Sequence, residues 1–154
     1  MHSTGNGCTY DDMRSMKNQN YDGIDRLTGL YNGEYALKEI QAYMEQNPEC
    51  TAAVYIMDID NVRTVDETLG RLFGNEIMKE IAAAICQVFG KQAVIGRIGG
   101  DKFLIFEKNY ESVGRIRENA KELCHRARST FKGEDQNFVI SLSIGIAIMP
   151  DDGY

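Results

Sequence analysis

A glycine-rich turn followed by an acid is the part of this chain best suited to chemistry. Residues 99–102, Gly-Gly-Asp-Lys, stand between two apolar runs at 93–98 and 103–106, which predicts a β-hairpin. Two glycines at its tip allow positive φ and leave the backbone open to a bulky anion such as phosphate. Asp101 directly after them can hold a metal ion against those phosphates. The plain alternative is a tight turn ending in a solvated Asp-Lys pair.

A second acidic segment ends an earlier apolar stretch. Residues 52–60 alternate as a β-strand, with Asp58 and Asp60 at its C-terminal end. Its apolar body predicts a strand buried on both faces, so Asp58 is expected to need a partner. Asp60 is either a functional carboxylate or the N-cap of a short helix at 61–69. Backbone N–H groups at 61–63 would start that helix and can receive phosphate oxygens.

The order of the predicted elements brings these two acidic segments together. From residue 52 onward it is strand, helix, strand, strand, helix, strand, which is the split βαβ or ferredoxin-like α+β arrangement with a mainly antiparallel sheet. A right-handed crossover makes the first two strands parallel, and the third fills the gap antiparallel to both. Asp101 should then lie at the same end of the sheet as Asp58 and Asp60. The remaining elements are a turn at 25–32, helices at 34–46, 72–89 and 111–131, and a strand at 138–149.

The predicted helices are amphipathic, and each shows an apolar stripe at helical spacing. In the first helix the stripe comprises Leu37, Ile40 and Met44. In the last helix it comprises Val113, Ile116, Ala120, Leu123 and Ala127. These stripes should face the sheet.

Composition narrows the function classes. The 154 residues fit one domain, and the net charge of -6 without a basic run argues against nucleic-acid binding. No stretch approaches the roughly 20 apolar residues of a membrane span, so no membrane contact is expected and a cytoplasmic location is predicted. Scattered cysteines (Cys8, Cys50, Cys86 and Cys124) suggest neither a disulfide framework nor a zinc site. Residues 1–22 are polar and are interpreted as a flexible linker or tag remnant, which leaves one domain at 23–154.

Four motifs in order carry a family resemblance. Residues 25–32 (DRLTGLYN), 58–60 (DID), 99–103 (GGDKF) and 141–145 (SLSIG) resemble the GGDEF, or diguanylate cyclase, domain family. Members condense two GTP molecules into cyclic di-GMP and pyrophosphate at a two-fold dimer interface. The resemblance therefore implies GTP or a related nucleotide, a homodimer and, in a longer protein, an upstream sensor domain.

The resemblance also implies roles for single residues. It assigns Mg²⁺ to Asp58, the Ile59 carbonyl and Asp101, and catalysis to Asp58, Asp101 and the position of Lys102. The guanine-reading positions align with Asp66 and Asn75, where the family usually has these two residue types exchanged. Asn75 is equally well explained as an exposed polar residue in a helix's first turn. The full set of implied nucleotide-binding positions is Asn61, Val62, Arg63, Asp66, Asn75, Gly99 and Gly100.

The departures from the family pattern matter as much as the matches. Lys102 stands where the family has glutamate; it can weaken divalent binding, contact phosphate directly, or point away from Asp101 by strand alternation. Gly90 and Ala93 occupy the Arg and Asp positions of the product-inhibition site, so that site is expected to be absent. The helix and strand that follow in the family are also expected to be missing.

These features predict a degenerate GGDEF domain with weak or no cyclase activity that still binds nucleotide. Two alternatives stay open. One is an active diguanylate cyclase, or a cyclase that makes another dinucleotide. The other is an interaction module that binds no nucleotide.

Overall fold

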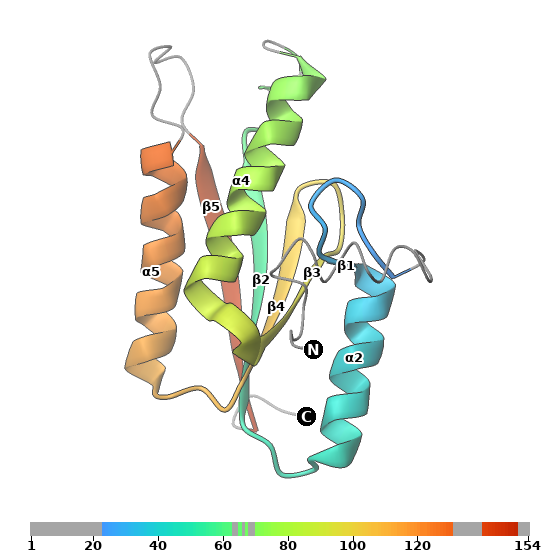
Figure 1. The fold of residues 1–154 in the computed structure, drawn as a ribbon. Helices are drawn as coiled ribbons and strands as arrows, with labels where there is room; N and C mark the ends of the chain where they lie inside the picture. Colours follow the sequence, from blue (N-terminus) through green and yellow to red (C-terminus); the bar gives the residue numbers. More distant parts are fainter. Residues whose placement is uncertain (1–22, 63–64, 66, 68–69, 131–139, 151–154) are drawn as a thin grey trace.

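The fold alternates helices with the strands of one sheet. A computed structural model of the chain describes residues 23–62, 65, 67, 70–130 and 140–150. Along the chain the elements are β1 (Tyr31–Asn32), α2 (Gly33–Gln46), β2 (Ala52–Asp60), α4 (Arg71–Phe89), a 3₁₀ turn (Gly90–Gln92), β3 (Ala93–Arg97), β4 (Lys102–Lys108), α5 (Val113–Thr130) and β5 (Ser141–Met149). Figure 1 shows these elements with the same labels.

The sheet confirms the predicted topology. Its strand order is β1-β3-β4-β2-β5, and β4 pairs antiparallel with both β3 and β2. The two strands joined by the α4 crossover therefore run parallel, with the hairpin strand between them. β5 pairs antiparallel with β2 along its full length and forms one edge of the sheet. The other edge, β1, was not predicted as a strand; it pairs parallel with β3 through two residues.

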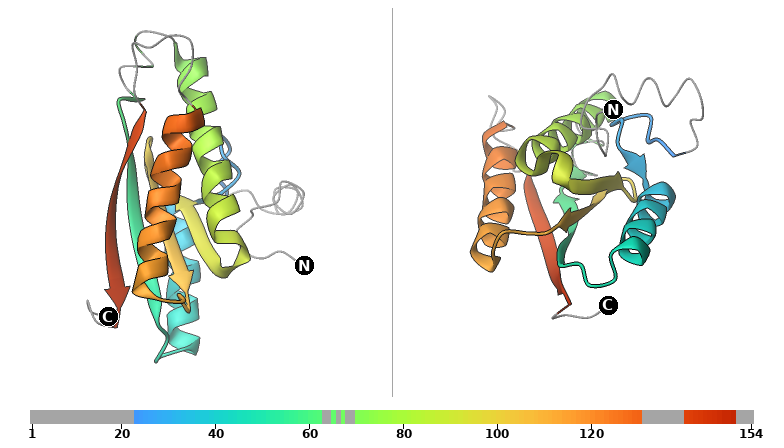
Figure 2. Two further views of the ribbon diagram at one scale, coloured as in Figure 1. Left: turned by 90° about the vertical axis from the view of Figure 1, so that its left-hand side faces the viewer. Right: turned by 60° about the horizontal axis from the view of Figure 1, so that its bottom comes forward.

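Helices cover the sheet on both faces. The α4 and α5 helices pack on one face, whereas α2 lies on the other, over β3 and β4 (Figures 1 and 2). The larger core lies under α4 and α5 and takes the inward residues of β2, Ala53, Tyr55, Met57 and Ile59. The smaller core lies under α2. The inward pattern of β2 thus follows the two-residue period of a strand.

The expectation that β2 is buried on both faces is wrong. The residues facing α4 and α5 are buried, but Ile56 on the opposite face is 40% exposed. The reason is the placement of α2, which covers β3 and β4 and leaves this part of β2 open. Asp58 shares the open face, where its carboxylate is partly exposed and has the partner expected of it, Lys102.

Two helix stripes also differ from prediction. In α2, Leu37 is 59% exposed, and Ala36 is the residue buried against the sheet. An ideal Cβ on Gly96 of β3 would lie 2.7 Å from the Ala36 Cβ, so helix and strand approach closely at two small residues. In α5, Val113 is exposed at the first turn, whereas Asn119 is buried because its amide reaches Glu107.

Helix boundaries follow from local chemistry. Asn32 caps α2, because its side chain accepts a hydrogen bond of 2.9 Å from the Tyr35 N–H. Gly70 before α4 and Gly90 after it have φ values of 98° and 65°, which side chains rarely allow. The α4 helix therefore lies between two glycines in conformations that other residues rarely adopt.

Among the helices that the structure describes, none combines the length and the apolar composition that a membrane span needs. Three cysteines fall in the described ranges, Cys50, Cys86 and Cys124, and none of the three is in a disulfide.

Candidate functional site

The β3–β4 hairpin places a short loop, residues 99–101, at one end of the sheet. The Ile98 N–H donates to the Lys102 carbonyl at 2.9 Å and closes the loop. Neither Gly99 nor Gly100 has a positive φ, so the expectation that they supply this geometry is wrong. Gly100 instead leaves the backbone of the loop accessible, because an added Cβ on this residue would meet no atom within 4 Å.

The Arg97 side chain connects this loop to the segment at 25–32. Its Nε and Nη2 donate to the Gly100 carbonyl at 3.1 and 2.7 Å, and its Nη1 lies 3.0 Å from Asp25 Oδ1. Asp25 also accepts the N–H and hydroxyl of Thr28, at 2.9 and 2.6 Å. The segment at 25–32 therefore braces the hairpin. Sequence reasoning missed Arg97, although its position two residues before a Gly-Gly pair was visible.

Asp58 and Lys102 form an ion pair across the β2–β4 ladder. They are direct partners in the register, and the Lys102 Nζ lies 2.6 Å from Asp58 Oδ1. Both side chains are partly open, with exposed fractions of 51% for Lys102 and 41% for Asp58. The hydrogen bond and the charge of Asp58 raise the pKa of Lys102 above its usual value, and the charge of Asp101 adds to this. Lys102 is therefore a fixed cation at neutral pH.

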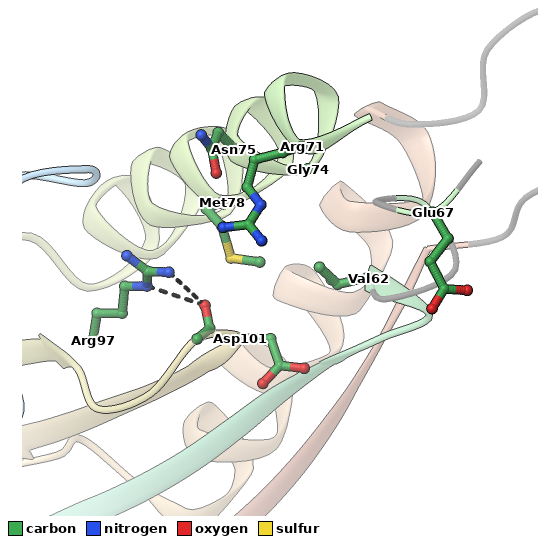
Figure 3. Close-up of a pocket in the computed structure, with 9 residues that line it drawn as sticks. Val62, Glu67, Arg71, Gly74, Asn75, Met78, Arg97 and Asp101 are labelled. Carbon is green, nitrogen blue, oxygen red and sulfur yellow. Dashed lines mark hydrogen bonds between the residues drawn. The ribbon is translucent and has the colours of Figure 1, made fainter. Parts of the chain in front are cut away.

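Asp101 lies beside Ile59 and faces a pocket. The Ile59 N–H donates to the Asp101 carbonyl at 3.0 Å, which confirms the prediction that the hairpin tip meets the C-terminal end of β2. The pocket has a volume of about 540 Å³ and lies between the hairpin loop, the start of the segment after β2, and α4 (Figure 3). It is lined by Val62, Glu67, Arg71, Gly74, Asn75, Met78, Arg97, Gly100 and Asp101.

The predicted nucleotide positions divide into three groups. Val62, Asn75 and Gly100 line the pocket together with Asp101. Gly99, Asn61 and the Asp58–Lys102 pair are not among its lining residues. Arg63 and Asp66 lie outside the described residues, so the exchanged guanine-reading pair stays a prediction.

Arg71, Met78 and Glu67 were not predicted as site residues. All three line the pocket, and Figure 3 shows the Arg71 guanidinium directed into it. Arg71 is the first residue of α4, directly after Gly70. The signal available in the sequence was the position of Arg71 at the start of a helix, directly after a glycine. The start of this helix lies at the same end of the sheet as the hairpin loop.

Asp60 has a different set of partners from Asp58. Its carboxylate accepts the hydroxyl of Ser141 at 2.8 Å and that of Ser143 at 3.2 Å. These serines belong to β5 and to the fourth motif, so Asp60 joins the ends of β2 and β5. A capping bond from Asp60 to the N–H of residue 63 lies outside the described residues.

The turn after β2 leads into the short helix predicted at 61–69, since the described residues Val62, Val65 and Glu67 are helical and Asn61 forms the turn before them. Asn61 has a φ of 71° and lies in the turn, and its carbonyl accepts the Val65 N–H at 3.1 Å. The left-handed conformation is tolerated by asparagine more readily than by most residues. The chain therefore turns sharply at residue 61 before Val62 enters the pocket wall.

Asp58, Ile59 and Asp101 are the residues that the resemblance assigns to Mg²⁺. Mg²⁺ requires free carboxylate or carbonyl oxygens in a near-octahedral shell. Asp58, Ile59 and Asp101 lie at adjoining positions, but the Asp58 carboxylate is engaged by the Lys102 ammonium. The residues as arranged do not fit the Mg²⁺ site that the resemblance implies.

Comparisons with known proteins identify the family of this chain. The model of the diguanylate cyclase GGDEF domain matches residues 23–154. The signaling protein YkoW of Bacillus subtilis is 28% identical over 132 residues, which cover 84% of this chain and 16% of that protein. The cyclic di-GMP phosphodiesterase PdeR of Escherichia coli is 29% identical over 129 residues, covering 84% of this chain and 19% of that protein. The chain thus spans less than a fifth of the length of either relative.

A solved structure shares the fold. The GGDEF domain of DgcB from Caulobacter crescentus, crystallised in complex with c-di-GMP, superposes with a TM-score of 0.72. The two chains are 23% identical, and the match covers 84% of this chain and 79% of that one. With the sheet topology, the motif positions and the family match in agreement, this chain belongs to the diguanylate cyclase GGDEF domain family.

Proposed function

We propose that this chain is a degenerate GGDEF signalling domain that binds a GTP-type nucleotide and has weak or no cyclase activity. The observation that carries the proposal is the ion pair between Lys102 and Asp58. In the family this corner neutralises a triphosphate through Mg²⁺, and here one of the implied metal ligands is held by a lysine. Two-metal assistance of phosphoryl chemistry requires those carboxylates to be available.

The pocket supports nucleotide binding. It is open at Gly100, where no side chain blocks the backbone, and it presents Arg71, Asn75 and Asp101. An arginine suits phosphate, and an amide or carboxylate can pair with a base edge. We propose GTP as the ligand because the domain family uses it; the match to a DgcB domain holding c-di-GMP supports a guanine nucleotide in this fold.

The names of the relatives are compatible with a domain that does not make cyclic di-GMP itself. One relative is named a signaling protein and another a cyclic di-GMP phosphodiesterase. Both are several times longer than this chain. We propose that this domain works next to further domains, including an upstream sensor, and that it pairs as a homodimer.

An activity assay tests the proposal. The purified chain is incubated with GTP and Mg²⁺, and cyclic di-GMP is sought by mass spectrometry. We expect weak or no product from the unchanged chain, with the Lys102→Glu variant assayed alongside it. Efficient turnover by the unchanged chain would contradict the proposal and support the active cyclase.

Calorimetry with GTP separates the proposal from a module that binds no nucleotide. Heat of binding that saturates, and that weakens in an Arg71→Ala variant, supports the nucleotide pocket. The matched control is Arg115→Ala, which removes an exposed arginine on α5. The absence of saturable heat would favour the interaction module.

A further inference from the structure

The Lys102 side chain is positioned by the strand register and by its ion pair with Asp58. The β2–β4 register sets residue 102 opposite Asp58, and the ammonium ends 2.6 Å from the carboxylate. An added Cβ on Gly99 would lie 3.6 Å from the Lys102 Cβ and 3.7 Å from its Cδ. The aliphatic stem therefore lies alongside the bare backbone of Gly99.

The ammonium retains donors for a ligand. A lysine ammonium has three N–H donors, and within the described residues Asp58 is its hydrogen-bond partner. Gly100, two residues away, is open and lines the pocket that also contains Asp101. Lys102 does not itself line the pocket, so its closeness to an anionic oxygen that enters beside Gly100 follows from the two-residue separation along the chain.

A divalent ion competes with this arrangement. A divalent ion at Asp58 would have to share the carboxylate with the ammonium that contacts its Oδ1, and the two positive charges would repel each other. Displacing the ammonium would break the ion pair and move the stem away from Gly99. The residues therefore favour the Lys102 ammonium, which is part of the chain, over a divalent ion, which exchanges with the solvent.

We propose that Lys102 takes the place of a divalent ion at Asp58, so that this site binds a nucleoside triphosphate without Mg²⁺. The identity of the ligand rests on the proposed function; the replacement of the metal does not. The two statements are tested with separate probes.

The first test uses metal alone. The chain is titrated with Mn²⁺, and the free ion is followed by electron paramagnetic resonance. We expect no saturable site in the unchanged chain and a new one in Lys102→Glu that disappears when Asp58→Asn is added. Lys79→Glu, which makes the same charge change on the exposed face of α4, should behave as the unchanged chain. A saturable site in the unchanged chain, or none in a folded Lys102→Glu, overturns the inference.

The second test uses GTP, titrated by calorimetry in EDTA and again in Mg²⁺. We expect equal affinity in the two buffers for the unchanged chain. Lys102→Met keeps an apolar stem without the charge, and it should weaken binding in EDTA by about tenfold or more, the value of a lost hydrogen bond to a charged group. Binding that appears only with Mg²⁺ overturns the inference. If GTP gives no heat in either buffer while the Mn²⁺ result is as expected, the proposed nucleotide function fails and the replacement of the metal stands.

Discussion

Arg97 at the end of β3 forms an ion pair with Asp25, 72 residues earlier in the chain, at 3.0 Å. Both side chains are only 18% exposed, and the same guanidinium holds the Gly100 carbonyl. Arg97 therefore connects the first motif to the hairpin loop, although neither was predicted to contact the other.

Removing Arg97 should loosen that unit. Arg97→Ala leaves Asp25 and the Gly100 carbonyl without their shared partner, and we expect a loss of about 2 kcal/mol in the free energy of unfolding, typical for hydrogen bonds to charged groups. Denaturant unfolding measures the loss. In a double-mutant cycle with Asp25→Asn, additive effects would show that the two side chains are not coupled.

Gly96 and Ala36 form the closest approach between α2 and the sheet. Gly96→Ala places a Cβ 2.7 Å from the Ala36 Cβ, so we expect overpacking that destabilises the fold by roughly 1–3 kcal/mol. Thermal unfolding reports the effect. The matched control is Gly145→Ala on β5, where an added Cβ meets nothing within 4 Å. Adding Ala36→Gly should recover part of the loss; no recovery would place the strain elsewhere.

Tyr55 is buried and donates its hydroxyl to Glu107 Oε1 at 2.7 Å. Burial, aided by the charge of Glu107, raises the pKa of Tyr55 above its usual value, with an opposing contribution from Asn119. An unfolded chain releases the tyrosine proton near pH ~10, where the folded chain still holds it, so stability is full below that pH and falls as pH rises above it. Ultraviolet titration should show one tyrosine that ionises only with unfolding. In Tyr55→Phe that late step should vanish.

Ser141 and Ser143 join β5 to the Asp60 carboxylate at the sheet edge. Ser141→Ala removes the shorter bond, of 2.8 Å, and we expect a loss of about 1 kcal/mol together with faster amide hydrogen exchange at the start of β5. Ser143→Ala, whose bond is 3.2 Å, should have a smaller effect. Equal exchange rates in all three proteins would show that Asp60 does not anchor the strand.

The sequence predicted the core topology because its strands and helices have strong periodic patterns. The hairpin and the crossover were confirmed by the β3–β4–β2 pairing. The strand at 31–32 was missed because two residues carry no period. Leu37 followed the helical period and is still exposed, because the close contact at Ala36 decides how α2 sits.

The candidate site was also predicted only in part. Its acids were located from residue type and topology, and their meeting at one end of the sheet was confirmed. Whether Lys102 faces Asp58 depends on strand register, which residue types alone left open. Arg97 and Arg71 were not predicted as site residues because their roles depend on contacts between segments far apart in the sequence.

The opposition of residues 58 and 102 across the ladder bears on how such domains diversify. The strands are joined there by main-chain bonds, whose pattern does not depend on the side chain at residue 102. An acid and a base are thus interchangeable at that position without altering the scaffold. The side chain at residue 102 can therefore change what neutralises the charge of Asp58, from a bound divalent ion to an ammonium of the chain itself, while the sheet stays the same.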